Sequence, residues 1–165
     1  NEEKALRSQQ IWAKSNRDYS RHSRPHFRHE LASLLGLYND HRFSGIALYL
    51  IASHHGRVRI GIRSLPSTFH STVPGSPKMV LGIEDGDRLP ELTLASDLIL
   101  PATELKLDPV YLGSSIQGDS WLARTLALRD NLEVGPFRLA YLEALLRAAD
   151  ARASARPQQG GDLDG

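Results

Sequence analysis

Apolar residues recur along this chain with a helical period in several segments and with a strand period in one. The first helical segment, residues 26–38, follows Pro25 and places its apolar side chains on one face. These side chains are Phe27, Leu31, Leu34, Leu35 and Tyr38. Residues 44–55 are apolar at nearly every position, which predicts a buried helix, and Gly56 can cap its C-terminus.

Two further helices are expected in the C-terminal part of the chain. Residues 119–130 can begin at a cap provided by Asp119 or Ser120. Residues 136–154 follow a break at Gly135 and keep a helical period for roughly five turns. The apolar positions of this last helix include Phe137, Leu139, Tyr141, Leu142, Leu145, Leu146 and Ala149.

The segment between the two helical regions has a different pattern. Residues 57–63 alternate basic and apolar side chains, which predicts a strand with one buried face. Residues 66–118 hold six of the nine prolines and five of the thirteen glycines, so we expect loops with one or two short hairpins. The predicted fold is therefore a mainly α-helical bundle over residues 26–156 with a small β insertion at about 57–118. Polar residues 1–25 are expected to form a linker, and residues 157–165 a disordered tail.

Charge is distributed unevenly, although the net charge of the 165 residues is only +1. Residues 1–63 carry 11 Lys and Arg against 5 Asp and Glu, whereas residues 64–165 carry 9 against 14. All seven histidines lie between His22 and His70. A basic, histidine-rich segment suits a polyanionic partner such as nucleic acid, although a solvated surface often has the same composition.

Several classes of protein are excluded by composition. The absence of cysteine rules out disulfides, zinc–thiolate sites and thiol catalysis. No apolar run approaches the ~20 residues that a membrane span requires. The sequence begins with Asn1 in a polar stretch, so we expect a fragment, a processed product or part of a longer protein.

Three places could carry chemistry: His29, the adjacent pair His54 and His55, and Asp150. Neighbouring helical residues point about 100° apart, so the paired histidines could bind two metal ions, or one ion and a phosphate. Imidazole and carboxylate ligands together suit Mn, Fe, Co or Ni. The commoner explanations are a surface histidine, an imidazolium that favours the helix dipole, and a solvated aspartate. The residues alone predict a helical domain with a candidate metal site.

Three strings of the sequence place these residues in a wider pattern: FRHELAS, YLIASHHGRVRIGIR and GPFRLAYLEALLRAADARAS. In this order they resemble the later motifs of the HD nuclease domain in the helicase–nuclease of type I CRISPR systems, closest to the I-U/I-G subgroup. The resemblance covers roughly residues 20–155 and implies an HD-domain-like helical bundle.

Carried over to this sequence, the resemblance implies a set of metal ligands. His29, His54, His55 and Asp150 match the family's ligand positions, with two divalent metal ions expected. We expect Arg57 and Arg59 to stand close enough to meet DNA phosphates. The family's earlier histidine and its His-Asp doublet have no match in residues 1–25, so the metal site is expected to be incomplete in this chain alone.

The implied function is the degradation of single-stranded target DNA by a metal-dependent nuclease in the prokaryotic cytoplasm. Its implied partners are a Cascade-type surveillance complex and the helicase part of the same protein, where ATP would bind. Two alternatives stay open: an HD phosphohydrolase for nucleotides or small phosphate esters, and an inactive fragment that docks the parent protein on its partners.

Overall fold

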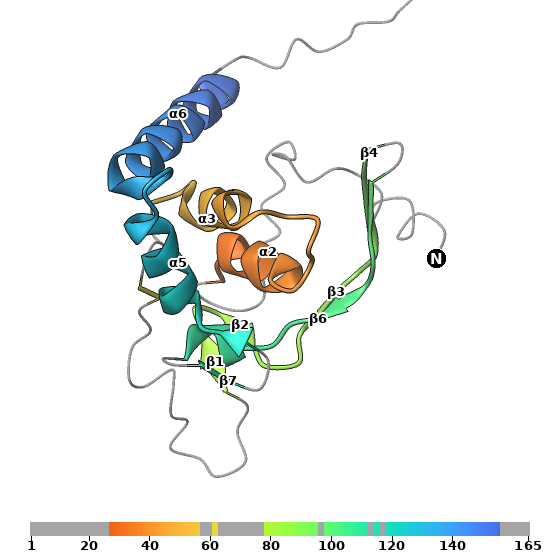
Figure 1. The fold of residues 1–165 in the computed structure, drawn as a ribbon. Coiled ribbons are helices and arrows are strands. Elements are labelled where there is room, and N and C mark those ends of the chain that lie inside the picture. The colour runs from red at the N-terminus through yellow and green to blue at the C-terminus, as the bar shows by residue number, and fades with distance from the viewer. Residues whose placement is uncertain are drawn as a thin grey trace, which may run out of the picture.

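The described part of the molecule is mixed but mostly helical. The computed structural model describes residues 27–56, 61–62, 78–95, 98–111, 114–115 and 118–155. Within these ranges it contains four α-helices and four small two-stranded antiparallel sheets (Figure 1). The predicted linker 1–25, most of the predicted strand 57–63 and the predicted tail 157–165 lie outside the described residues.

Helix α2 spans His29–Leu37 and buries the apolar face that its sequence predicts. It begins later than expected because Arg28 is extended, and the Arg28 amide donates a hydrogen bond to the Leu81 carbonyl at 3.1 Å. That long-range bond holds the residue before His29 outside the helix. Leu31, Leu34, Leu35 and Tyr38 are all buried.

Helix α3 spans Gly45–Ser53, and both of its ends are capped. The Ser44 hydroxyl accepts a hydrogen bond from the Ala47 amide at 3.2 Å. Gly56 has a φ of 69°, and its amide donates to the Ser53 carbonyl at 2.6 Å, which confirms the predicted glycine cap. The helix is only partly buried, contrary to its continuous apolar sequence. Its buried residues are Leu48, Tyr49, Ala52 and Ser53.

In its described residues the β insertion holds more strand pairs than the predicted one or two hairpins. Three hairpins join neighbouring strands, and one further pair joins β3 to β6. The hairpin strands are β1 (Met79–Val80) with β2 (Ile83–Glu84), β4 (Leu92–Ala95) with β5 (Leu98–Leu100), and β7 (Ser114–Ser115) with β8 (Gly118–Asp119). Strand β3 spans Arg88–Leu89, and β6 spans Thr103–Glu104.

Strands β3 to β6 form one antiparallel ribbon that is interrupted by prolines. Arg88 pairs with Glu104, and in the same register Leu92 pairs with Leu100. Proline has no amide hydrogen to donate to a ladder, and Pro90 and Pro101 fall in the gap between the two paired stretches. The ribbon extends from the helices on one side of the molecule (Figure 1). The short paired stretches are therefore parts of a single long hairpin.

Two C-terminal helices complete the fold. Helix α5 spans Trp121–Asp130 and is capped by Ser120, whose hydroxyl accepts from the Ala123 amide at 3.2 Å. Helix α6 spans Gly135–Ala155, within one residue of the predicted bounds. A short 3-10 turn, η2, lies at Asp108–Val110.

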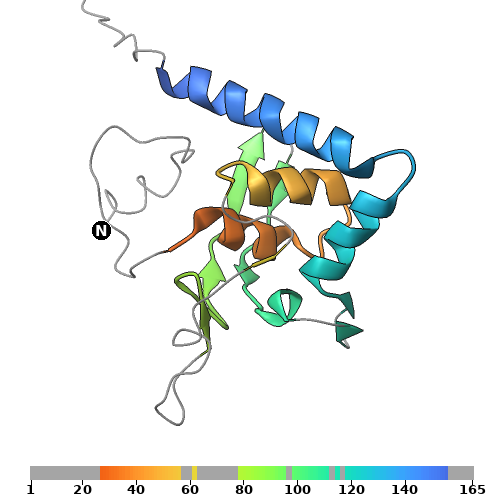
Figure 2. The ribbon, with the colours of Figure 1, turned by 90° about the vertical axis from the view of Figure 1, so that its left-hand side faces the viewer.

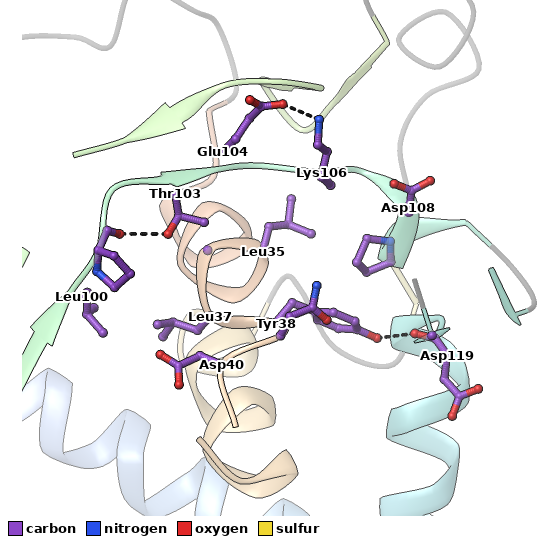
Figure 3. Close-up of a pocket in the computed structure, with 15 residues that line it drawn as sticks. Leu35, Leu37, Tyr38, Asp40, Leu100, Thr103, Glu104, Lys106, Asp108 and Asp119 are labelled. Atoms are coloured by element: carbon purple, nitrogen blue, oxygen red, sulfur yellow. Dashed lines mark hydrogen bonds and ion pairs between the residues drawn. The ribbon is translucent and has the colours of Figure 1, made fainter. Parts of the chain in front are cut away.

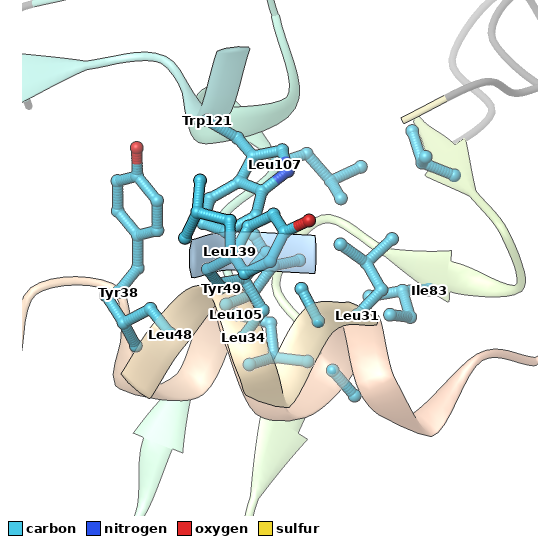
Figure 4. Close-up of a cluster of buried hydrophobic side chains, with 14 residues drawn as sticks. Leu31, Leu34, Tyr38, Leu48, Tyr49, Ile83, Leu105, Leu107, Trp121 and Leu139 are labelled. Carbon is cyan, nitrogen blue, oxygen red and sulfur yellow. The ribbon is translucent and has the colours of Figure 1, made fainter. Parts of the chain in front are cut away.

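The hydrophobic core lies between α2, α3, α5 and the β insertion (Figure 4). Trp121, Leu31 and Leu34 are its largest fully buried side chains. Helix α6 lies along the surface, as Figure 2 shows, and adds only Leu139 to the buried apolar cluster. Its exposed large apolar side chains are Phe137, Tyr141 and Leu145. No helix in the described ranges is long and apolar enough to cross a bilayer.

Candidate metal centre

His29 is the first residue of helix α2, and its side chain is 62% exposed. The helix starts at this residue because the preceding Arg28 is held in an extended conformation by its bond to Leu81. The first turn of a helix has no preceding turn to cover it, so a long side chain there can reach beyond the helix end.

His54 and His55 directly follow the last residue of helix α3. His54 still has helical backbone angles, and Gly56 then turns the chain away in the left-handed conformation. Because the helix packs against α2, the core holds the two histidines at a fixed place in the fold.

The antiparallel packing of α2 and α3 brings the three histidines together. The start of α2 and the end of α3 lie at the same end of the pair (Figure 2). Ligand nitrogens of His29, His54 and His55 all lie within 4.8 Å of one another. His29 Nε2 is 2.9 Å from His55 Nε2, and the His54 and His55 ring centroids are 4.1 Å apart.

Hydrogen bonds set the orientation of the rings. His54 Nδ1 lies 2.6 Å from the Ile51 carbonyl oxygen, which can only accept, so Nδ1 carries the proton. The Nε2 atom of neutral His54 is then left with its lone pair available to a metal ion. The 2.9 Å separation between His29 Nε2 and His55 Nε2 lets one ring donate a hydrogen bond to the other, and an ion bound by both atoms would take the place of that proton.

The electrostatics of His29 favour its neutral form. Burial lowers the pKa of His29, and the neighbouring His55, His54 and Arg28 lower it further. The Glu30 carboxyl group opposes part of this shift and raises the pKa. Because only the neutral ring can bind a metal ion, the net lowering keeps His29 competent as a ligand at lower pH than an ordinary histidine.

The three imidazoles fit a single divalent ion. Nitrogens that bind one ion at ~2.0–2.1 Å lie roughly 3–4 Å apart, and the three ligand nitrogens here lie within 4.8 Å of one another. Three protein ligands leave coordination positions open for water or substrate, as in catalytic metal sites. The histidine triad (His29, His54 and His55) could therefore hold a metal ion.

Asp150 is not part of the cluster that the triad forms. It lies on α6 and is partly buried, and its carbonyl oxygen accepts a hydrogen bond from the Ser154 hydroxyl at 2.6 Å. Three of the four predicted ligands thus come together, and the role of Asp150 stays a prediction. Arg57 and Arg59 lie outside the described residues.

The sequence did not predict the burial of two acidic residues in the described ranges. Glu30 is 1% exposed beside His29, and Glu143 on α6 accepts a hydrogen bond from the Tyr49 hydroxyl at 3.2 Å. The spacing of Glu30 from Leu34 could have predicted the burial of Glu30, because residues four apart share one helical face. No local pattern links Tyr49 with Glu143, since α3 and α6 are far apart in sequence.

Two cavities lie elsewhere in the described structure. One, of about 330 Å³, lies at the C-terminal end of α2, opposite the end that carries His29 (Figure 3). None of its lining residues is a histidine, and its Glu104 pairs with Lys106. The other, of about 560 Å³, lies between α3, α5 and α6 and contains the Tyr49–Glu143 contact. Neither cavity is lined by the triad.

Comparisons with protein-family models, with curated proteins and with solved structures find no match to this chain. The resemblance to the HD nuclease domain therefore stays a prediction from its motifs. The geometry of the triad is independent of that resemblance.

Proposed function

We propose that this chain contributes the metal centre of an HD-type nuclease that degrades single-stranded DNA as part of a CRISPR helicase–nuclease. The observation that carries the proposal is the histidine triad. Its residues come from the start of α2 and from just after the end of α3, and their ligand nitrogens lie within 4.8 Å of one another. His29 and His55, whose Nε2 atoms are 2.9 Å apart, are separated by 26 positions in the sequence. The same three residues are the histidines that the motif resemblance assigns as ligands.

The chemistry of the proposal is hydrolysis of a phosphodiester bond. A bound divalent ion would lower the pKa of a water molecule and polarise a phosphoryl oxygen. The triad would hold the ion, and its exposed position at the helix ends leaves room for a polymer to approach. The excess of basic residues before residue 64 suits a polyanionic substrate.

A second ion would need ligands in addition to the triad. The family pattern places two ions of Mn, Fe, Co or Ni, bridged by a carboxylate. We propose Asp150 as one carboxylate ligand, with further ligands supplied by the longer parent protein. ATP binding and strand feeding would belong to its helicase part, and delivery to the target would belong to a Cascade-type surveillance complex.

The test is cleavage of a labelled single-stranded oligonucleotide by the full-length helicase–nuclease with Mn²⁺, Co²⁺ or Ni²⁺. We expect the double substitution His54→Ala/His55→Ala to abolish cleavage, because it removes two of the three triad ligands. ATP hydrolysis should persist, since the proposed helicase part, where ATP would bind, lies outside this chain. His41→Ala is the matched control, because His41 is exposed and lies outside the triad.

Three other results would each change the proposal in a different way. Cleavage that survives the double substitution contradicts the ligand assignment. Hydrolysis of nucleotides or small phosphate esters without DNA cleavage favours the phosphohydrolase. A protein that binds no metal and cleaves nothing favours the docking role.

A further inference from the structure

The buried carboxyl group of Glu30 lies beside the histidine triad. Glu30 is 1% exposed, and its Oε2 atom is 3.7 Å from His29 Nδ1. Its other oxygen, Oε1, is buried and makes no hydrogen bond within the part of the chain that the structure describes. A buried carboxyl oxygen without a partner opposes folding, so a glutamate at this position needs an explanation.

The His29 ring stands between Glu30 and the other histidines. Its Nε2 atom lies 2.9 Å from His55 Nε2, whereas its Nδ1 atom faces Glu30. Histidines that bind metal ions usually donate their second ring N–H to a carboxylate or carbonyl, which fixes the tautomer and the ring orientation. His54 already has this arrangement through the Ile51 carbonyl.

We propose that Glu30 is a positioning residue of the metal centre, which accepts a hydrogen bond from His29 Nδ1 and so directs the Nε2 lone pair toward the ion. The inference rests on the proposed metal site. A small ring rotation would shorten the 3.7 Å separation to hydrogen-bond length. The negative charge also makes Nε2 a stronger ligand and offsets part of the charge of the cation. Glu30 does this without touching the ion or the substrate.

A Co²⁺ titration of the full chain, followed by visible absorption, tests this role. Glu30→Gln keeps the size of the side chain and removes its charge, and we expect ~10–100-fold weaker Co²⁺ binding. Glu143→Gln is the matched control, because Glu143 is also a buried helical glutamate but lies outside the triad. It should leave the Co²⁺ affinity unchanged.

A second measurement separates positioning from a general structural effect. With Zn²⁺ bound, long-range ¹H–¹⁵N spectra should show His29 coordinated through Nε2, with a proton on Nδ1 shifted downfield by Glu30. Glu30→Gln should move that Nδ1 proton upfield, and Glu143→Gln should not. If Glu30→Gln fails to fold, Glu30→Asp replaces it. Aspartate keeps the charge but withdraws it from His29, so it should also weaken Co²⁺ binding.

The possible results test the positioning role of Glu30 separately from the metal site. Undiminished Co²⁺ affinity and an unshifted His29 proton in the Glu30 variant would overturn the positioning role and leave the metal site standing. Equal losses in both glutamate variants would also overturn it, because they would reflect general destabilisation. Failure of the unaltered chain to bind Co²⁺ would overturn the metal site and the role of Glu30 with it.

Discussion

Individual charged residues in this protein act through close, specific partners. Arg42 forms a forked contact with Asp40, with its Nε and Nη2 atoms 2.9 Å and 2.6 Å from the two carboxylate oxygens. It also donates to the Ile99 carbonyl at 3.1 Å and so connects the turn after α2 to strand β5. Such bidentate pairs are stronger than single contacts between exposed charges.

The Asp40–Arg42 pair gives a prediction about pH. The Arg42 hydrogen bonds lower the pKa of Asp40 to about 2, so the carboxylate stays ionised in the folded protein below its usual range. The stabilisation from the pair is present above pH ~4 and is lost as the pH falls through 2. NMR titration of Arg42→Ala should return the Asp40 pKa to roughly 3.9. The pKa of Asp130, which pairs with Arg129, should not move.

At the scale of secondary structure, the ends of the elements matter more to the candidate site than their middles. All three histidines lie at or just beyond a helix end. The caps that place those ends are short-range: Ser44 begins α3, and Gly56 ends the turn that carries His54 and His55. A change at a cap should therefore disturb the metal centre without touching a ligand.

Gly56→Ala tests this coupling of a cap to the site. Gly56 has a φ of 69°, where a side chain costs about 1–2 kcal/mol, so the free energy of unfolding should fall by about that amount. Co²⁺ affinity should fall too, because the adjacent histidines would shift. Gly61→Ala is the control, since an added methyl group there meets nothing within 4 Å. Denaturant unfolding and Co²⁺ titration measure both effects, and an unchanged Gly56→Ala variant would refute the coupling.

At the scale of the whole molecule, one core holds the helices and the β insertion together. Leu34 of α2 and Leu48 of α3 belong to the same buried cluster as Leu105 and Trp121. The triad depends on this core, because nothing in the local sequence holds the start of α2 against the end of α3. Stability and metal binding should therefore be linked.

Leu34→Ala should lower the free energy of unfolding by about 2–5 kcal/mol, because it leaves a cavity in a fully buried position. Leu132→Ala is the matched control, since Leu132 is fully exposed and its loss should change stability by less than about 0.5 kcal/mol. Urea unfolding followed by circular dichroism gives both values. Equal effects would mean that the core is not where the structure places it.

The sequence by itself determined the helices and much of their capping. The apolar period of α2, the Ser120 cap and the Gly56 terminus depend on residues within a turn or two of one another, so local patterns predict them. The Ser44 cap is equally local, although only a helix over residues 44–55 was predicted there. The three histidines were also identified as candidate ligands from the motifs. The predicted bounds of α6 were correct to one residue for the same reason.

Only the tertiary structure decided which of these residues meet. The gathering of His29 with His54 and His55, the burial of Glu30 and the Tyr49–Glu143 contact all depend on the packing of one helix against another. The β3–β6 pair likewise joins strands that are separated by a whole hairpin. Packing between distant segments is a collective property of the core, and a local pattern of side chains does not encode it.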